Sequence, residues 1–350
     1  MSTLAEKIGV TEEVINTQPH IDWKSGYEYI DGIKKLKKEK NAIILAHNYQ
    51  NADIVFGVAD VVGDSLMLCY EAAKAKADLV VVAGVYFMAE AAKVLNPQKT
   101  ILMPEPLAGC SLDSSITVKD ILDLRKKYPG VPIVCYVNVG ADVMALCDGT
   151  CTVGNALDII ESFSNESVIF LPDKFLAQYI SGKTKKNIIG WHGTCVVHEQ
   201  FTVQDIKAMK EAYNGDLDVI AHPECSPEIE KEVDFMGSTN ELISYVEDLK
   251  PRNVFVLTDC ALANNLKVTN PETSFVSVCK MCPYMQQITL KKIYHALLNE
   301  NPRVNLSKET MIGAKKVLDD MININPYNVA KGKEESAKSI LMTKYAREYD

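Results

Sequence analysis

Short runs of apolar, often β-branched residues recur along the chain, and each run ends in a polar cluster. They form three series of three: 42–48, 132–138 and 218–224; then 78–84, 167–173 and 253–259; then 100–105, 187–193 and 274–279. Short apolar runs bounded by Gly, Pro and Asp are typical of buried parallel strands. The pattern therefore predicts three similar groups of three strands.

Amphipathic segments between these runs predict helices, such as 27–38, 116–128 and 201–213. The last two each contain a Thr at the expected N-cap that is followed three residues later by Asp, which is a helix N-terminal signal. Strands that alternate with helices indicate parallel sheets joined by right-handed crossovers. We therefore expect an α/β fold with three pseudo-threefold-related α/β/α sandwich domains, whose small parallel sheets surround a central cavity. The predicted domains are 22–112, 113–197 and 198–284, followed by C-terminal helices within 285–350 that pack back on the first repeat.

Three cysteines repeat in register with these units. Cys110, Cys195 and Cys282 each stand seven residues before a threonine that opens a helix, at intervals of 85 and 87 residues (195 − 110 and 282 − 195). Periodic self-similarity of this kind outweighs local propensity in choosing a fold. In parallel α/β sheets ligands bind beyond the carboxyl ends of the strands. Three units around one axis would thus direct three thiols at a shared cavity.

Composition narrows the class of protein. The chain has 350 residues and a net charge of −9, and its basic residues are dispersed apart from a run at 34–40, so nucleic acid is not expected as a partner. No apolar run reaches the ~18 residues that cross a bilayer, and the N-terminus lacks a secretory apolar segment. Ten cysteines without such a signal indicate a reducing cytoplasm, where clustered thiols bind metal or react. We therefore expect a cytoplasmic enzyme that associates with no membrane.

Three converging thiolates indicate a metal centre. Iron–sulfur clusters are normally held by four cysteines, so three ligands would leave one iron open as a Lewis acid for removing water. Zinc held by three cysteines and water is an alternative, and three buried packing residues are another. Cys279 and Cys282 also form a CxxC pair, and a regulatory disulfide between them is a hypothesis. The remaining cysteines are taken as packing residues: Cys69, Cys135, Cys147, Cys151, Cys225 and Cys260.

A second threefold series occurs at predicted helix starts. Gly63-Asp64-Ser65, Gly154-Asn155 and Gly237-Ser238-Thr239 each follow a first strand of the repeat and open a helix. Free N–H groups at helix N-termini bind phosphate or carboxylate, although each start alone is better explained as an ordinary cap. Around a common cavity, they predict a small substrate with several negative charges.

Ordered motifs from about residue 40 to 295 resemble the quinolinate synthases. The segments are AHNYQ (46–50), GDS (63–65), AGCSL (108–112), YVN (136–138), CT-x-x-NA (151–156), PD-x-x-LA (172–177), WHGTCVVHE (191–199), AHPEC (221–225), GST (237–239) and CPYMQQITL (282–290). The resemblance implies three α/β/α units around one [4Fe–4S] cluster. It also implies a transferase that condenses iminoaspartate with dihydroxyacetone phosphate, with loss of phosphate and two waters, to give quinolinate for NAD synthesis. An aspartate oxidase or dehydrogenase would be its functional partner.

The resemblance also assigns roles to particular residues. Cys110, Cys195 and Cys282 match the cluster ligands, and Tyr49, His222, Glu224 and His47 match catalytic positions. Glu224 would orient the imidazole of His222, Tyr49 would assist proton transfer, and Tyr136 and Asn138 would hold substrate carboxylates. The substrate-binding positions implied are His47, Ser65, Tyr136, Asn138, His198, His222, Glu224, Ser238 and Thr239.

Three polar positions depart from the family pattern. Val153 stands where a hydroxyl-bearing residue is usual, Asp259 stands in place of a glutamate, and Gln286 in place of a lysine. These changes keep a second reading open, in which the chain is a paralogous [4Fe–4S] lyase or synthase with a different small anionic substrate. A third interpretation is a non-catalytic iron–sulfur sensor, but the presence of acid–base residues argues against it.

Overall fold

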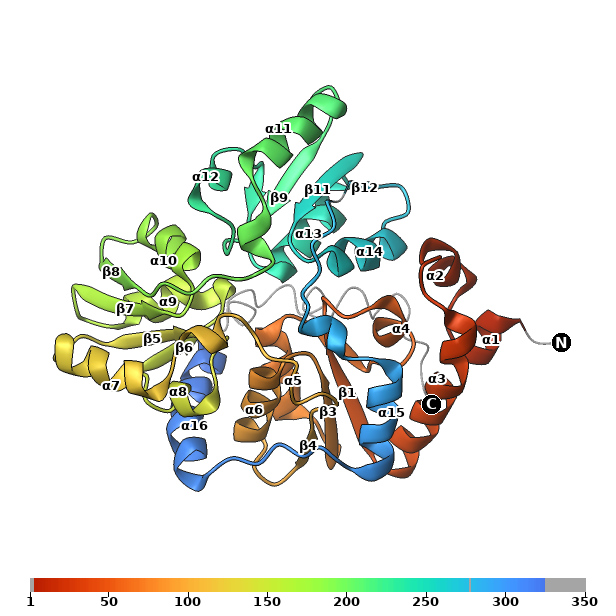
Figure 1. The fold of residues 1–350 in the computed structure, drawn as a ribbon, viewed down its shortest axis with the longest axis horizontal. Helices are drawn as coiled ribbons and strands as arrows, with labels where there is room; N and C mark the ends of the chain where they lie inside the picture. Colours follow the sequence, from red (N-terminus) through yellow and green to blue (C-terminus); the bar gives the residue numbers. More distant parts are fainter. Residues whose placement is uncertain (1–2, 277, 325–350) are drawn as a thin grey trace.

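The computed structural model describes residues 3–276 and 278–324, and Figure 1 shows three α/β units around a common centre. Each unit has one four-stranded parallel sheet, which confirms the predicted fold class. The sheet orders are β2-β1-β3-β4, β6-β5-β7-β8 and β10-β9-β11-β12. The same order recurs three times, so the sequence repeat is a repeat of topology. In the part of the chain that the structure describes, no helix combines the length and hydropathy of a membrane span.

Nine of the strands correspond to the predicted apolar runs, within a few residues at each end. They are β1 (Ala42–His47), β3 (Leu79–Ala83), β4 (Thr100–Leu102), β5 (Ile133–Tyr136), β7 (Ser167–Leu171), β8 (Asn187–Gly190), β9 (Asp218–Ala221), β11 (Asn253–Leu257) and β12 (Ser274–Val276). The prediction of three strands per unit was wrong by one. An edge strand of two or three residues completes each sheet: β2 (Val61–Gly63), β6 (Gly149–Cys151) and β10 (Phe235–Met236). Strands this short are too brief to show a period of two.

Helices cover the sheets of each unit. They are α3 (Trp23–Glu39), α4 (Ala52–Val55), α5 (Ser65–Lys74) and α6 (Tyr86–Leu95); α7 (Val118–Lys127), α8 (Ala141–Met144), α9 (Ala156–Ser162) and α10 (Lys174–Ser181); and α11 (Val203–Ala212), α12 (Pro227–Glu230), α13 (Thr239–Leu249) and α14 (Cys260–Thr269). Two short helices precede them, α1 (Leu4–Ile8) and α2 (Glu12–Thr17). As predicted, Thr117 and Thr202 cap α7 and α11, each in a reciprocal capping box with the Asp three residues later. Thr289 caps the next helix of the series.

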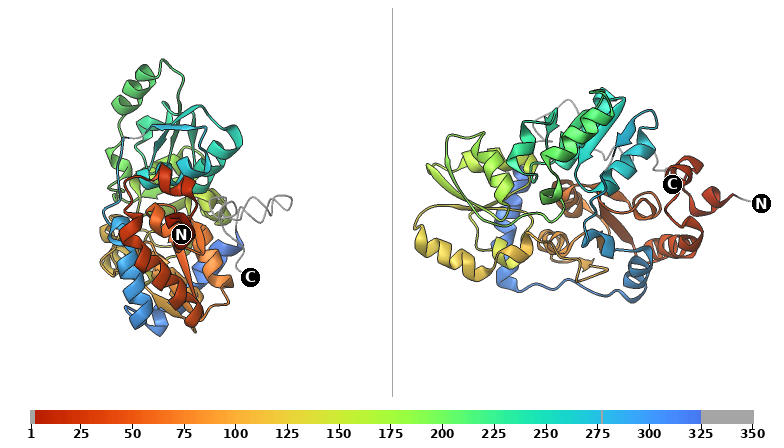
Figure 2. Two further views of the ribbon diagram at one scale, coloured as in Figure 1. Left: turned by 90° about the vertical axis from the view of Figure 1, so that its right-hand side faces the viewer. Right: turned by 45° about the horizontal axis from the view of Figure 1, so that its top comes forward.

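The C-terminal helices join units rather than forming one of their own. α15 (Leu290–Asn299) packs along α3, and α16 (Lys308–Asn323) packs against α6 of the first unit and against β6 and α8 of the second. Between them, the backbone of Val304 donates to Ile101 and so covers the outer edge of β4. Figure 2 shows α16, in blue, beside both units. The domain limits at 112, 197 and 284 stay a prediction, and the part of the C-terminal segment after residue 324 lies outside the described residues.

Candidate active site

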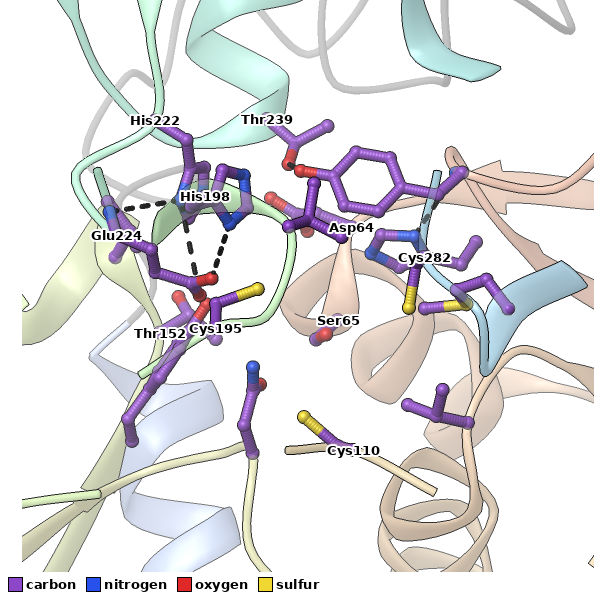
Figure 3. A pocket seen from close by; sticks show the side chains of 18 of the residues that line it. Asp64, Ser65, Cys110, Thr152, Cys195, His198, His222, Glu224, Thr239 and Cys282 are labelled. Carbon is purple, nitrogen blue, oxygen red and sulfur yellow. Dashed lines mark hydrogen bonds and ion pairs between the residues drawn. The ribbon is translucent and has the colours of Figure 1, made fainter. Parts of the chain in front are cut away.

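The loops that follow the strands of all three sheets line one pocket (Figure 3). Every residue that the sequence assigned to catalysis, substrate binding or metal ligation lies on its wall. These residues are His47, Tyr49, Ser65, Cys110, Tyr136, Asn138, Cys195, His198, His222, Glu224, Ser238, Thr239 and Cys282. The pocket thus collects side chains whose positions along the chain span more than two hundred residues.

The three cysteines occupy equivalent places in the repeat. Cys110, Cys195 and Cys282 follow β4, β8 and β12, and each precedes a short 3₁₀ turn and a Thr-capped helix. The turns are η1 (Asp113–Ser115), η3 (His198–Gln200) and η4 (Met285–Gln287). In the metal-free chain, burial raises the pKa of all three thiols above the ordinary value. Such thiols become thiolates when a metal binds, because metal ligation releases their protons.

The spacing of the sulfurs tests which metal centre they fit. Among the described residues, the group of ligand atoms that all lie within 4.8 Å of one another comes from Cys195, His198 and Glu224, and the three cysteines do not form such a group. A tetrahedral zinc ion with Zn–S bonds of about 2.3 Å would hold its sulfurs only about 3.8 Å apart. A single zinc ion would therefore need the three sulfurs to move closer together. Thiols from three loops that each reach a different metal atom suit a multi-iron cluster, in which each iron takes one thiolate.

The ends of the central strands carry paired pocket residues. His47 ends β1 and Tyr49 follows it, and His222 and Glu224 follow β9. In both pairs the imidazole Nδ1 accepts the backbone N–H two residues later, at 3.2 Å from Tyr49 and 3.4 Å from Glu224. A neutral imidazole whose Nδ1 accepts carries its proton on Nε2. Burial lowers the pKa of His47 to about 4 and that of His222 to about 3, so both rings are neutral at pH 7.

Glu224 pairs with a different histidine from the one predicted. Its Oε2 lies 2.8 Å from Nδ1 of His198, whereas its Oε1 lies 4.0 Å from Nδ1 of His222. The prediction that Glu224 orients His222 stays a prediction: the backbone N–H of Glu224 donates to Nδ1 of His222, while its carboxylate lies against His198. The two imidazoles stack, with ring centroids 4.7 Å apart. Burial alone would raise the pKa of Glu224, but His222, His198 and the hydroxyl of Tyr136 hold it below its ordinary value, so the carboxylate is ionised.

A buried threonine links the two halves of this constellation. The hydroxyl of Thr258, at the end of β11, lies 2.8 Å from Nε2 of His198 and 2.6 Å from the hydroxyl of Tyr49. Tyr49 also contacts the Thr239 hydroxyl at 3.2 Å. A continuous chain thus runs from Glu224 through His198 and Thr258 to Tyr49. Sequence reasoning missed the role of Thr258, and its one signal was its place at a strand end of the repeat.

The helix starts around the pocket follow the short edge strands rather than the first strands. Asp64 caps α5 and places Ser65 at its first turn, and Ser238 caps α13 in a capping box. In the second unit the turn starts at Thr152, two residues before the predicted position, as η2 (Val153–Asn155). Thr152 lines the pocket together with Val153. Two full helix N-termini and one hydroxyl-bearing turn therefore offer donors to anionic groups.

Comparison with known sequences identifies the family. A family profile described as "Quinolinate synthetase A protein" matches residues 31–323.

The chain belongs to this family.

Named relatives agree with that placement. The quinolinate synthase of Sinorhizobium fredii is 44% identical over 313 residues, which cover 89% of this chain and 87% of the relative. The quinolinate synthase of Caulobacter vibrioides is 45% identical over 326 residues, covering 92% and 89%. Quinolinate synthase 2 of Mesorhizobium japonicum is 50% identical over 279 residues, covering 80% and 86%. The resemblance recognised in the sequence is confirmed.

Three residues of this quinolinate synthetase A family member depart from the family pattern. Two of them lie outside the pocket lining, and one lies in it. Asp259 is buried, and its Oδ2 accepts the backbone N–H of Cys282 at 2.7 Å while Oδ1 accepts that of Ala261 at 2.8 Å. Its role is thus to hold a predicted ligand loop. Gln286 lies in η4, and no described residue accepts a hydrogen bond from its Nε2. Only Val153 contacts the space that a substrate would fill.

In this family member the cysteine pairing also differs from the hypothesis. Cys279 forms a disulfide with Cys260, not with Cys282, and the Cα atoms of the pair are 5.1 Å apart. Cys260 is therefore not a simple packing residue. The backbone N–H of Cys260 donates to Lys280 at 3.1 Å, so tertiary contact brings the start of α14 beside the segment before Cys282. The Cys282 thiol stays free and faces the pocket.

Proposed function

We propose that the chain is a cytoplasmic quinolinate synthase. It condenses iminoaspartate with dihydroxyacetone phosphate, releases phosphate and two waters, and yields quinolinate for NAD synthesis, drawing iminoaspartate from an aspartate oxidase or dehydrogenase. Cys110, Cys195 and Cys282 hold a [4Fe–4S] cluster. The observation that carries the proposal is the convergence of three repeat-equivalent thiols on a pocket that also contains a buried acid–base chain.

Anionic substrates are bound by groups that the fold presents at the pocket wall. The N-termini of α5 and α13, with the hydroxyls of Ser65, Ser238 and Thr239, suit a phosphate and a carboxylate. Tyr136, at the end of β5, and Asn138, just after it, reach the same pocket from the second unit and hold a further carboxylate. When bound, the cluster supplies an open iron that polarises a substrate oxygen.

Proton movement uses the buried chain. Burial and nearby negative charge keep the pKa of Tyr49 well above its ordinary value, so its hydroxyl is a donor at pH 7. Thr258 relays a proton between that hydroxyl and Nε2 of His198. The ionised Glu224, 2.8 Å from the other ring nitrogen, stabilises the imidazolium that forms when His198 takes up a proton. Positioned groups of this kind contribute about 10²–10⁴-fold to a rate.

Val153 supports a second candidate function, that of a related iron–sulfur enzyme acting on another small anionic substrate. It replaces a hydroxyl group on the pocket wall with an apolar one. The neighbouring Thr152 also lines the pocket, but its hydroxyl lies 3.3 Å from Oδ1 of Asn155 in the capping turn. Loss of one donor to a charged group costs about 1.5–3 kcal/mol, which is enough to alter substrate preference.

The test is an anaerobic turnover assay on protein with a reconstituted cluster. Dihydroxyacetone phosphate and enzymatically generated iminoaspartate are supplied, and quinolinate is measured. We expect product from the wild type and none from Cys195→Ser. An intact cluster that yields no quinolinate would reject the proposed activity and favour the second candidate, which a Val153→Ser variant that gains turnover would support.

A further inference from the structure

A second metal-binding group lies inside the same pocket. The ligand atoms of Cys195, His198 and Glu224 all lie within 4.8 Å of one another. Figure 3 shows them together on one side of the pocket, whereas Cys110 and Cys282 lie apart from them. Of this trio, only Cys195 belongs to the proposed cluster ligands. The grouping of a sulfur, a nitrogen and a carboxylate oxygen is thus distinct from the wider cysteine trio.

The surroundings of His198 match those of a metal ligand. Its Nε2 lies 2.8 Å from the Thr258 hydroxyl, and a metal-binding histidine almost always donates its other ring N–H in this way. Its Nδ1 is buried and lies 2.8 Å from Oε2 of Glu224, which is the length of a hydrogen bond that the Nδ1 proton makes to the carboxylate. A cation that displaces this proton would take both Nδ1 and the carboxylate as ligands, and Nε2–H would then donate to Thr258.

The geometry and the donor set favour zinc. Three protein ligands drawn from sulfur, nitrogen and oxygen, with a fourth position left open, are typical of catalytic zinc sites. Tetrahedral bonds of about 2.0–2.3 Å require ligand atoms about 3.3–3.8 Å apart. The site is therefore completed if the His198–Glu224 pair, now at 2.8 Å, opens slightly and Cys195 moves by up to about 1 Å. The open position would face the pocket, because all three residues line it.

We propose that the cluster-free chain binds one Zn²⁺ ion through Cys195 Sγ, His198 Nδ1 and the Glu224 carboxylate. The consequence for the enzyme rests on the proposed function. Because Cys195 serves both centres, the zinc ion and the cluster exclude each other, and the ion also occupies two members of the acid–base chain. Zn²⁺ binds such donor sets more tightly than Fe²⁺ does. Zinc therefore holds the chain in an inactive form that blocks cluster loading.

Cobalt(II) tests the site directly, because a thiolate bound to Co²⁺ gives a near-ultraviolet charge-transfer band. The full-length, cluster-free chain is titrated with Co²⁺ without oxygen, and bound Co²⁺ is then displaced with Zn²⁺. We expect one equivalent of Co²⁺ and a band that is absent in Cys195→Ser. His198→Asn and Glu224→Gln should each weaken Co²⁺ binding at least about tenfold. Cys110→Ser and Cys282→Ser are the matched controls, and both should bind Co²⁺ as the wild type does.

The controls decide between the narrow trio and the three cysteines. Loss of the band in Cys110→Ser or Cys282→Ser would overturn the proposal, as would a band that survives in Cys195→Ser or no band in the wild type. Circular dichroism of each variant confirms that it is folded. None of these measurements needs turnover. Co²⁺ binding without quinolinate formation would therefore reject the proposed activity and leave the proposed metal site standing. In a further arm, one equivalent of Zn²⁺ should prevent cluster reconstitution, and unchanged reconstitution would refute the mutual exclusion.

Discussion

Removing the hydroxyl of Thr258 should break the buried chain without changing the shape of the site. Thr258 is 1% exposed, and its Oγ1 lies 2.6 Å from the Tyr49 hydroxyl and 2.8 Å from Nε2 of His198. Thr258→Val is nearly isosteric and leaves both partners in place. Tyr49 keeps its contact with Thr239, so the loss falls mainly on His198.

The expected decrease in kcat follows from the two hydrogen bonds that Thr258→Val removes. A buried polar group left without its partner costs about 1–3 kcal/mol, and a neutral hydrogen bond contributes about 1 kcal/mol. A combined loss of about 3 kcal/mol in the transition state lowers kcat about 100-fold, since each 1.36 kcal/mol is tenfold. The KM values should change little, because Thr258 does not line the pocket.

The assay is steady-state quinolinate formation under anaerobic conditions, with iron content measured for each variant. Thr258→Ser restores the hydroxyl and should recover kcat to within about threefold of the wild type. A Thr258→Val variant with a full cluster and unchanged kcat would refute the relay. A variant whose KM alone rises would show that Thr258 acts in substrate binding instead.

Two further predictions follow from buried carboxylates. The Asn side chain of Asp259→Asn cannot accept both backbone N–H groups, so we expect a chelator to remove the cluster about tenfold faster from this variant. Asp173→Asn is the matched control. Asp173 also caps a helix, α10, but no described residue donates to its Oδ2. Equal cluster loss in both variants would contradict a specific role at Cys282. Burial raises the pKa of Glu90 from 4.5 to about 7, so the folded chain binds more protons than the unfolded chain and loses stability as pH rises through this interval. Glu90→Gln should therefore raise the free energy of unfolding by up to about 3 kcal/mol at pH 8.5 and by almost nothing at pH 4. Urea denaturation at the two pH values measures the difference, and a difference that does not change with pH would count against this explanation.

Local sequence was sufficient for the three units and for the polar residues and cysteines at the strand ends that line the pocket. An apolar run followed by a polar tip specifies a buried parallel strand and its carboxyl end, as with His47 at the end of β1 and His222 after β9. The interval from each cysteine to its capping threonine placed Cys110, Cys195 and Cys282 at equivalent loops, because the same turn and capped helix recur. These features depend on neighbours along the chain, so a single sequence reveals them.

Contacts between distant residues were decided only by the tertiary structure. Thr258 reaches Tyr49 across 209 positions and His198 across 60, and Glu224 turned toward His198 although His222 is its neighbour in sequence. Cys279 pairs with Cys260 rather than with the nearby Cys282. No local propensity encodes such pairs, because the packing of three sheets around one pocket sets which side chains meet. The sequence thus determines which groups enter the site, and the assembled fold determines which of them bond to one another.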